Sequence, residues 1–359
     1  METKAISAKA GDSRILAVSD IHGNLELFRQ LLKVCAYQPG KDVLVIAGDF
    51  LEKGLDSLGT LRFVMELAEQ EGVYVLSGNC DLHMLVTTDE GCFGTLYRWQ
   101  ERDYLWQMAK ESGTPLPGEP GETGVFRRKL EERYPREFQF LRSLPHILET
   151  ERYLFAHAGL QGEDLDHQDW EYVVSVPWFP QGTEHRFSKR LVVGHYPTAN
   201  FREGVINNAP YFHQAHNVLS MDGGNMVKTL GQLNAVILDP DGERWTWTCA
   251  QHGERISAPI SQQERPGITV IWPHNQVERV EPRGEFTLCR VVESGVLVEI
   301  PEEFLHQSEG KLVTGDVTDR RLAVEKGESV TVLRRYGSGM LISKDTGEMG
   351  WLDMGQPDL

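Results

Sequence analysis

Residues 14–49 read RILAVSDIHGNLELFRQLLKVCAYQPGKDVLVIAGD and contain two short apolar runs, each followed by an acidic residue. The first run, residues 15–18, is followed by Asp20, and the second, residues 43–47, is followed by Asp49. Short apolar runs bounded by turn residues are typical of buried strands. Ligands of open α/β sheets bind outside the carboxyl ends of the strands, so we expect both carboxylates at that edge.

A helix is predicted between these two strands, because Asn24 is a favourable N-cap and apolar residues then recur at helical spacing until Gln38-Pro39-Gly40. A second unit repeats the pattern, with a helix over residues 58–68 and a strand over residues 73–76. This alternation predicts an α/β fold with a largely parallel sheet that is covered by helices.

The pattern changes further along the chain. Residues 82–145 are rich in aromatic residues and predict a helical insertion, which either pads the fold or shapes a substrate site. Strand-like runs return at residues 153–156, 191–193, 218–221 and 233–238, and residues 245–249 alternate as in a hairpin partner of the last run. We therefore expect one catalytic domain over residues 1–250.

The C-terminal part has a different composition. Residues 251–266 are polar, contain two prolines and predict a linker. Residues 267–359 contain only short strand-like runs, and residues 280–297 weakly resemble residues 324–341. We expect one or two small SH3-like β modules here, which would bind a peptide or cell-wall material.

Charge and cysteine usage limit the partners and the compartment. The chain has 36 Lys plus Arg against 53 Asp plus Glu, a formal net charge of −17, which argues against nucleic acid or an anionic membrane as a partner. No apolar run approaches about 18 residues and no apolar segment precedes the first strand, so we expect a cytoplasmic protein without membrane spans. The five cysteines are widely spaced without a CxxC pair, which favours reduced thiols.

Polar side chains follow five of the predicted strands. In chain order they are Asp20 with His22, Asp49, Asn79, His157 and His195. Each motif alone is common by chance, and a single histidine of this kind is more often a satisfied polar residue. The ordered series of all five predicts a site that binds metal ions.

Two divalent cations explain these residue types. Carboxylate and imidazole suit Mn, Fe or Zn, and a carboxylate shared by two cations holds them roughly 3.5–4 Å apart. We expect Asp49 to be this bridge. Asp20 and His22 complete one metal site, while Asn79, His157 and His195 complete the other. Two cations clamp the oxygens of a phosphoryl group, so the predicted chemistry is phosphoester hydrolysis, with Mn²⁺ as the favoured ion and Fe or Zn as alternatives.

The motifs SDIHGN, AGDFLEKG, LSGNCD, FAHAGL and VVGHYPT resemble those of the calcineurin-like metallophosphoesterases. The segment SMDGGNMVKTLGQLNAVILD resembles the closing segment of that family. The resemblance implies a metallophosphoesterase-type β-sandwich flanked by helices. Many members have a Gly-His-x-His motif, but Tyr196-Pro197 follows His195 here, as in the bacterial branch of the phosphoprotein phosphatases.

Two departures affect the catalytic residues. Lys53 stands where the family has a phosphate-binding arginine, and it keeps the charge without the bidentate fork. Cys80 stands where the family has a histidine that protonates the leaving group. Cys80 is therefore a structural residue, a slow substitute for the acid, or a redox-sensitive thiol. Together with Asp49, Cys80 and Asp81 are the candidate catalytic residues.

Phosphate contacts are less clearly indicated. Lys53, Asn79 and Tyr196 are the candidate substrate-binding residues. His83 offers an alternative proton donor, and the basic residues Arg186, Lys189 and Arg190 offer alternative phosphate contacts, although a surface or structural role is the simpler explanation for these four.

These features together predict a hydrolase of phosphomonoesters that acts by in-line attack of a metal-bridging hydroxide. Phosphoserine or phosphothreonine protein is the first substrate class. The enzymatic alternative is a small-nucleotide or phosphodiester hydrolase, acting on a diadenosine-polyphosphate-like compound or on a cyclic or aryl diester. The non-enzymatic alternative is a scaffold that acts through its C-terminal β modules.

Overall fold

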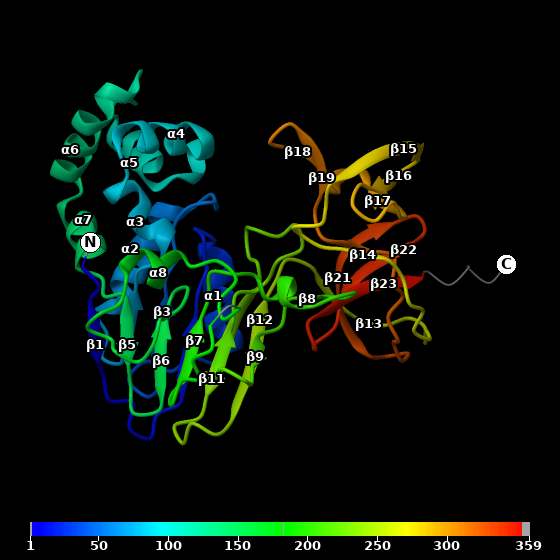
Figure 1. Ribbon diagram of the computed structural model, residues 1–359, viewed down its shortest axis with the longest axis horizontal. Helices are drawn as coiled ribbons and strands as arrows, with labels where there is room; N and C mark the ends of the chain where they lie inside the picture. The colour runs from blue at the N-terminus through cyan, green and yellow to red at the C-terminus, as the bar shows by residue number, and fades with distance from the viewer. Residues whose placement is uncertain (1, 182, 354–359) are drawn as a thin grey trace. The chain divides into compact units, whose positions relative to one another are not determined.

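The computed structural model describes residues 2–181 and 183–353. These residues form two compact units (Figure 1). The first contains the chain up to Tyr196 together with Pro210–Met226 and Leu233–Ala250, and the second contains Pro197–Ala209, Val227–Gln232 and the chain from Gln251 onward. Among the described helices, none combines the length and the apolar character that a membrane crossing requires.

Two sheets form the centre of the first unit. The strands of one are β2 (Ile15–Val18), β3 (Val43–Ala47), β4 (Val73–Leu76), β11 (Leu233–Leu238) and β12 (Trp245–Ala250), in the order β12-β11-β2-β3-β4. Strands β2, β3 and β4 are parallel, and β11 and β12 form an antiparallel hairpin. The predicted parallel strands and the predicted hairpin are therefore confirmed.

The second sheet has the order β1-β5-β6-β7-β10-β9. Its strands are β1 (Ala5–Ser7), β5 (Ile147–Glu149), β6 (Tyr153–Ala156), β7 (Arg190–Val193), β9 (Tyr211–His213) and β10 (Val218–Ser220). Parallel pairing joins β6 to β7 and β7 to β10, so the chain segments that precede His157, His195 and Asp222 all end at one edge.

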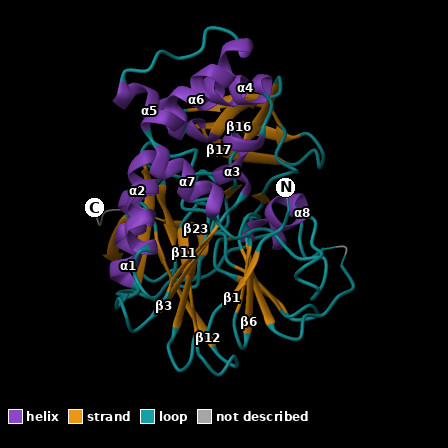
Figure 2. Cartoon of the chain, turned by 90° about the vertical axis from the view of Figure 1, so that its left-hand side faces the viewer, coloured by secondary structure: helices purple, strands orange, loops and turns teal. Residues whose placement is uncertain are grey.

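Residues of β2 alternate between two cores. Ile15 lies in the core between the two sheets, together with Phe155 and Val192 of the facing sheet. Leu16 lies in a second core, which is covered by α1 (Leu25–Val34) and α2 (Ser57–Ala68). Helix α8 (Trp170–Ser175) packs on the outer face of the other sheet. The fold is thus the predicted β-sandwich flanked by helices, and Figure 2 shows its two layers of strands.

The region between β4 and β5 is helical. It contains α3 (Asn79–Val86), α4 (Asp89–Trp99), η1 (Gln100–Arg102), α5 (Tyr104–Ser112), η2 (Pro120–Glu122), α6 (Thr123–Arg133) and α7 (Pro135–Ser143). Its apolar residues, among them Leu96, Tyr104 and Phe126, join the core that covers β2 and β3. Helices α3 to α6 cluster at one end of the sheets, and α3 begins directly after β4 (Figure 1).

The second unit is built almost entirely of β-strands. They are β8 (Ile206–Asn207), β13 (Glu254–Ser257), β14 (Thr269–Val270), β15 (Val277–Arg283), β16 (Phe286–Val291), β17 (Leu297–Pro301), β18 (Leu305–Ser308), β19 (Lys311–Thr314), β20 (Val317–Thr318), β21 (Ser329–Tyr336), β22 (Gly339–Ser343) and β23 (Glu348–Asp353), with short turns η3 (Thr198–Phe201) and η4 (Glu302–Phe304). The predicted all-β character of the C-terminal region is confirmed.

Two features of this unit differ from the expected arrangement of a linker followed by independent modules. Strand β13 lies within residues 251–266, for which a linker is predicted, and it pairs with β21. Strand β8 comes from the segment after Tyr196 and pairs with β23, where Ile206 faces Met349. Ile206 and Leu230 are buried in the same core as Leu341 and Trp351. The domain boundaries and the SH3-like assignment remain predictions.

Candidate metal centre

The loops that follow β2, β3 and β7 hold their polar residues in a strained backbone conformation. Asp20, His22, Asp49 and His195 have φ angles of 56°, 49°, 51° and 67°, in the left-handed region that costs non-glycine residues roughly 1–3 kcal/mol each. The loops brace one another, because the Asp20 N–H donates to Gly48 O at 3.1 Å and the His22 N–H donates to Asp49 O at 3.0 Å. The surrounding fold maintains this strained backbone, which directs the four side chains toward one another.

Glycines allow these loops to approach closely. A Cβ atom on Gly48, whose φ is +85°, would lie 2.5 Å from the backbone nitrogen of Gly78. A Cβ atom on Gly78 would lie 2.2 Å from Asp49 Oδ1. The Gly48-Asp49 and Gly78-Asn79 motifs therefore need their glycines for contact between the two loops.

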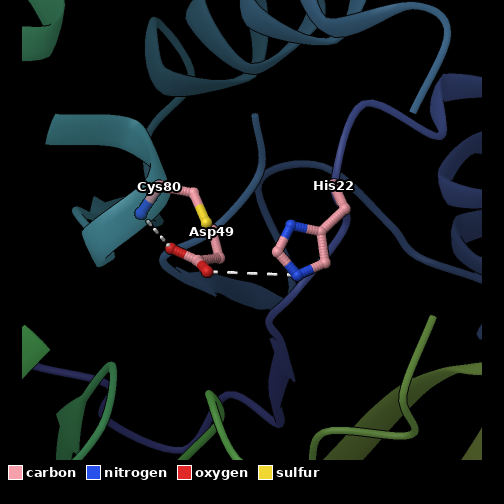
Figure 3. A group of neighbouring side chains, drawn as sticks. All are labelled: His22, Asp49 and Cys80. Atoms are coloured by element: carbon pink, nitrogen blue, oxygen red, sulfur yellow. Dashed lines mark hydrogen bonds and ion pairs between the residues drawn. The ribbon is translucent and has the colours of Figure 1, made fainter. Parts of the chain in front are cut away.

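Asp49 joins two groups of metal-ligating side chains. The first contains His22, Asp49 and Cys80, and one ligand atom from each lies within 4.8 Å of the others. Within it, His22 Nε2 lies 3.9 Å from Asp49 Oδ2, and the Cys80 N–H donates to Asp49 Oδ1 at 2.8 Å (Figure 3). Asp20 adjoins this group, with Oδ1 3.7 Å from His22 Nε2.

The second group contains Asp49, His157 and His195. His157 Nε2 lies 3.4 Å from Asp49 Oδ1. One end of the Asn79 side-chain amide lies 3.0 Å from His195 Nδ1 and 3.3 Å from His157 Nε2. The structure thus brings all six predicted metal ligands together, with Asp49 in the central position expected of a bridge.

Backbone carbonyls orient two of the imidazoles. Nδ1 of His22 lies 3.2 Å from Leu51 O, and Nδ1 of His157 lies 2.9 Å from Ala47 O. A proton on each Nδ1 satisfies these carbonyls and, with metal bound, would leave the Nε2 lone pair free for the ion, which is the usual arrangement of metal-binding histidine.

The buried carboxylates around Asp49 would be stabilised by bound cations. Burial raises the pKa of Asp20, and the neighbouring Asp49 carboxylate raises it further. Burial would lower the pKa of His157, but the Asp49 carboxylate outweighs it and raises the pKa to about 10. Protonated His157 in turn holds the pKa of Asp49 well below its usual value, against the effect of burial.

Lys53 supplies a cation to the first group. Its Nζ lies 3.0 Å from His22 Nε2. Burial opposes its charge, but Cys80, Asp49 and Asp20 together raise the pKa of Lys53. A side-chain ammonium therefore stands among the atoms of the first group, which shows that the cluster accommodates positive charge. The donor set of carboxylates, imidazoles and an amide oxygen fits divalent metal ions.

The predicted catalytic residues have different surroundings. The Cys80 thiol is buried, and burial together with Asp49 raises the pKa of the thiol well above its usual value. Asp81 is fully buried, and its carboxylate accepts the N–H groups of Asp49 at 2.8 Å, Gly78 at 2.8 Å and Leu51 at 3.1 Å. Through these three bonds Asp81 positions the loops that carry Asp49 and Gly78.

Other predicted residues lie elsewhere or make other contacts. The Tyr196 ring packs 5.0 Å from that of Trp178 and is largely buried. His83 Nε2 lies 2.9 Å from Thr95 Oγ1, outside both ligand groups. The three basic residues precede or begin β7, at the end opposite His195: Arg186 donates to Gln214 O and Ala215 O, Lys189 pairs with Glu149, and Arg190 lies over the Phe212 ring.

Asp222 and Asn225 are candidate site residues that were not singled out from the sequence. Asp222 is buried, and burial followed by the charge of Asp20 raises its pKa well above the usual value. The Asn225 amide donates to Asp20 O at 3.2 Å and to Ile21 O at 2.8 Å. The signal available in the sequence was the Asp-Gly-Gly turn directly after β10.

Comparisons with known proteins agree with this geometry. The model of the calcineurin-like phosphoesterase family matches residues 13–222. A symmetrical bis(5'-nucleosyl)-tetraphosphatase from Chromobacterium violaceum is 32% identical over 184 residues, which cover 51% of this chain and 57% of the relative. One of the same name from Aeromonas salmonicida is 47% identical over 72 residues, which cover 20% of this chain and 26% of the relative.

A metallophosphoesterase from Sphaerobacter thermophilus has a solved structure that matches with a TM-score of 0.40 and 15% identity, over 67% of this chain and 89% of that one. The matched part of this chain spans 57% of the first curated relative and 26% of the second. The family match, however, covers every one of the six ligand positions and most of the two-sheet unit. The chain belongs to the calcineurin-like phosphoesterase family.

Proposed function

We propose that this chain is a metal-dependent hydrolase of dinucleoside polyphosphates, which cleaves a phosphoanhydride bond. The first expectation from the sequence, a protein serine/threonine phosphatase, receives less support than its small-nucleotide alternative. The curated relatives described above carry the name symmetrical bis(5'-nucleosyl)-tetraphosphatase, and the proposal takes bis(5'-nucleosyl) tetraphosphate as the substrate.

The surroundings of Cys80 are the observation that carries this choice. Release of a serine alkoxide requires a proton from a well-placed acid. A cysteine offers no imidazolium proton, and in the metal-free protein burial and Asp49 raise the pKa of the Cys80 thiol well above its usual value, so Cys80 is a poor proton donor. A nucleoside diphosphate, in contrast, leaves as a stable anion, because phosphate groups have a second pKa of about 6. The site therefore suits a phosphoanhydride better than a phosphoserine.

The chain's own residues have defined tasks in this proposal. Asp20, His22 and Asp49 would hold one cation, while Asp49, Asn79, His157 and His195 would hold the other. When bound, the two cations would neutralise phosphoryl charge and lower the pKa of water. The Lys53 ammonium would contact a phosphate oxygen as a point charge. Asp81 keeps the loops of Asp49 and Gly78 in register through its backbone hydrogen bonds.

A substrate panel on the full-length, metal-replete protein tests the proposal. The substrates are diadenosine tetraphosphate, a phosphoserine peptide, p-nitrophenyl phosphate and bis(p-nitrophenyl) phosphate. We expect diadenosine tetraphosphate to give two molecules of ADP, with a kcat/KM above that of the other three. An Asp49→Asn variant, purified in the same way, controls for contaminating phosphatases.

Two outcomes would contradict the proposal. A phosphoserine peptide turned over as efficiently as the dinucleotide would restore the protein-phosphatase reading. Turnover of the diester alone would favour the phosphodiesterase alternative. The cytoplasmic location, the preference for Mn²⁺ and the binding of a peptide or cell-wall partner by the C-terminal unit remain predictions from the sequence.

A further inference from the structure

Cys80 occupies a position beside the first cation site that the proposed function leaves without a task. We propose that Cys80 Sγ is a metal ligand, which together with His22 and Asp49 makes this site selective for a thiophilic cation such as Zn²⁺ or Fe²⁺. This inference rests on the metal centre of the proposed function. It differs from the Mn²⁺ preference expected from the sequence.

The geometry of the three side chains suits one ion. One ligand atom from each residue lies within 4.8 Å of the other two. Protein ligands lie about 2.0–2.3 Å from zinc, so two ligands at a tetrahedral angle are about 3.3–3.8 Å apart. His22 Nε2 and Asp49 Oδ2 already lie 3.9 Å apart, close to this separation. Figure 3 shows the Cys80 sulfur and the His22 ring approaching the Asp49 carboxylate from two sides.

The backbone holds Cys80 in this position. Its N–H donates to Asp49 Oδ1 at 2.8 Å, and Cys80 lies in the first turn of α3, directly after Asn79. Asp49, which receives this bond, is itself held by Asp81 through its own N–H. The sulfur is thus attached to the same hydrogen-bonded loops as the other ligands, and Cys80 as a residue is only 9% exposed.

Lys53 provides an independent indication that a cation belongs between these atoms. Its ammonium lies 3.0 Å from His22 Nε2 and interacts electrostatically with Cys80 and Asp49. The His22 Nε2 lone pair accepts either the Lys53 proton or a metal ion. A bound metal would therefore release the long Lys53 side chain, which then becomes available to a phosphate.

The ligand chemistry determines the choice of metal. Thiolate sulfur is a soft ligand that favours zinc and iron, whereas Mn²⁺ and Mg²⁺ prefer oxygen ligands. The Asp20 and Asp49 carboxylates and the Cys80 thiolate would surround this ion with three negative charges, of which Asp49 would share its charge with the second cation. The thiol proton passes to solvent as the metal–sulfur bond forms, and neither partner is oxidised or reduced.

Cobalt substitution in the full-length protein tests this assignment. Co²⁺ bound to a thiolate gives a sulfur-to-metal charge-transfer absorption in the near ultraviolet, and oxygen and nitrogen ligands give none there. We expect the wild-type protein to bind two Co²⁺ ions and to show this absorption. Cys80→Ser should lose the absorption, while Cys92→Ser, which removes another buried free thiol, should retain it.

Metal selectivity gives a second readout. Loss of hydrogen-bond partners around a metal site typically lowers affinity about 10- to 100-fold, and loss of a ligand should cost at least as much. We expect Cys80→Ser to lose at least about tenfold in Zn²⁺ affinity and less in Mn²⁺ affinity. X-ray absorption of the zinc-loaded wild-type protein should show a sulfur neighbour at about 2.3 Å. This measurement uses the wild-type protein alone, so it does not depend on whether a variant folds.

The outcomes separate the inference from the proposed function. Cobalt binding without the absorption, an absorption that persists in Cys80→Ser, or a zinc site without sulfur would overturn the role of Cys80 and leave the metal centre intact. Failure of the wild-type protein to bind any divalent ion would overturn the metal centre itself.

Discussion

The Asp81 carboxylate accepts the backbone N–H of Asp49 at 2.8 Å, and through the same oxygen it accepts the N–H of Gly78 at 2.8 Å. One buried side chain at the start of α3 thereby fixes two ligand loops that come from neighbouring strands. The precision of the Asp49 position depends on a residue that need not contact substrate.

Asp81→Asn should weaken metal binding through this bracing. The amide places an N–H₂ group where an oxygen now accepts backbone protons, and each buried donor left unsatisfied costs about 1–3 kcal/mol. We expect a lower midpoint in urea unfolding and a lower metal affinity by calorimetry. Asp103→Asn is the matched control, because Asp103 is another buried acid with a pKa raised to about 7 by burial, and its Oδ1 caps α5 at Trp106. It should lose stability and keep its metal affinity. Unchanged metal affinity in Asp81→Asn would show that the bracing is unimportant.

Gly78→Ala should disrupt the centre by contact with Asp49. The new Cβ would lie 2.2 Å from Asp49 Oδ1, and overpacking of this kind costs about 1–3 kcal/mol. Metal stoichiometry, measured by elemental analysis after dialysis, should fall. Gly94→Ala in α4 has nothing within 4 Å of its Cβ and should leave stoichiometry unchanged while stabilising the helix by about 0.5–1 kcal/mol. Equal stoichiometry in both variants would be inconsistent with close contact of the loops.

Lys53→Gln should bind the first metal more tightly than the wild-type protein. A metal ion then no longer has to displace the ammonium from His22 Nε2, and hydrogen bonds to charged groups contribute about 1.5–3 kcal/mol, or roughly 10- to 100-fold in affinity. The same variant should show a higher KM, because a phosphate-binding charge is lost. Lys189→Gln, which removes a lysine paired with Glu149, should change neither quantity. Weaker metal binding in Lys53→Gln would mean that Lys53 shapes the site instead of competing for it.

The metal-free protein should lose stability as the pH rises from about 6.5 to 10. The pKa of His157 is raised from 6.5 to about 10, because the Asp49 carboxylate outweighs burial. The stability that protonated His157 contributes is complete below pH 6.5, the pKa in the unfolded chain. It is lost as the pH rises to about 10, the pKa in the folded protein, and between these values the folding constant falls about tenfold per pH unit. The Cys80 thiol, whose pKa burial and Asp49 raise well above 9.0, acts in the same direction above pH 9.

Urea unfolding in EDTA between pH 6.5 and 9 measures this slope. Saturating metal should remove it, because a metal-bound His157 carries no proton on Nε2. A His157→Gln variant in EDTA should also have a flatter profile. Stability that increases with pH in the metal-free wild-type protein would contradict the assigned protonation of His157.

Truncation after Ala250 should not yield a stable catalytic domain. Ile206 and Leu230 precede that position, yet both are buried among residues of the C-terminal strands. Without the residues that surround it, each of these large side chains should lose about 2–5 kcal/mol of its contribution to the free energy of unfolding. We expect the truncated chain to aggregate or to melt at a lower temperature than the full chain. Ile206→Ala in the full-length protein should show a smaller shift of the same sign, and a truncated chain as stable as the full one would refute this expectation.

The ligand positions could be predicted from the sequence because local signals are strong there. Short apolar runs end at polar residues, and parallel strands bring Asp20, Asp49 and Asn79 to one edge whatever the details of packing. The helix after Asn24 could be located for the same reason, since its side chain caps Leu27 as expected.

Contacts that depend on tertiary packing could not be predicted in this way. Nothing in the local pattern indicates that Asp81 turns toward three backbone amides, or that Ile206 pairs with Met349. Arg186 and Lys189 looked available to phosphate because they precede His195 closely in sequence, but a strand separates the two ends by its full length. The proposed substrate class depends on the surroundings of one residue, Cys80, whose burial the sequence does not specify.

The pairing of β8 with β23 bears on how the protein is made. Ile206 leaves the ribosome long before Met349, and at about 5–20 residues per second the delay is roughly 7 to 29 seconds. During this interval β8 lacks its partner strand, and the Ile206 side chain lacks the core in which it is buried. A growing chain is therefore vulnerable to aggregation until β23 is synthesised, and a stop codon between β8 and β23 should deplete the whole protein and not only its C-terminal unit.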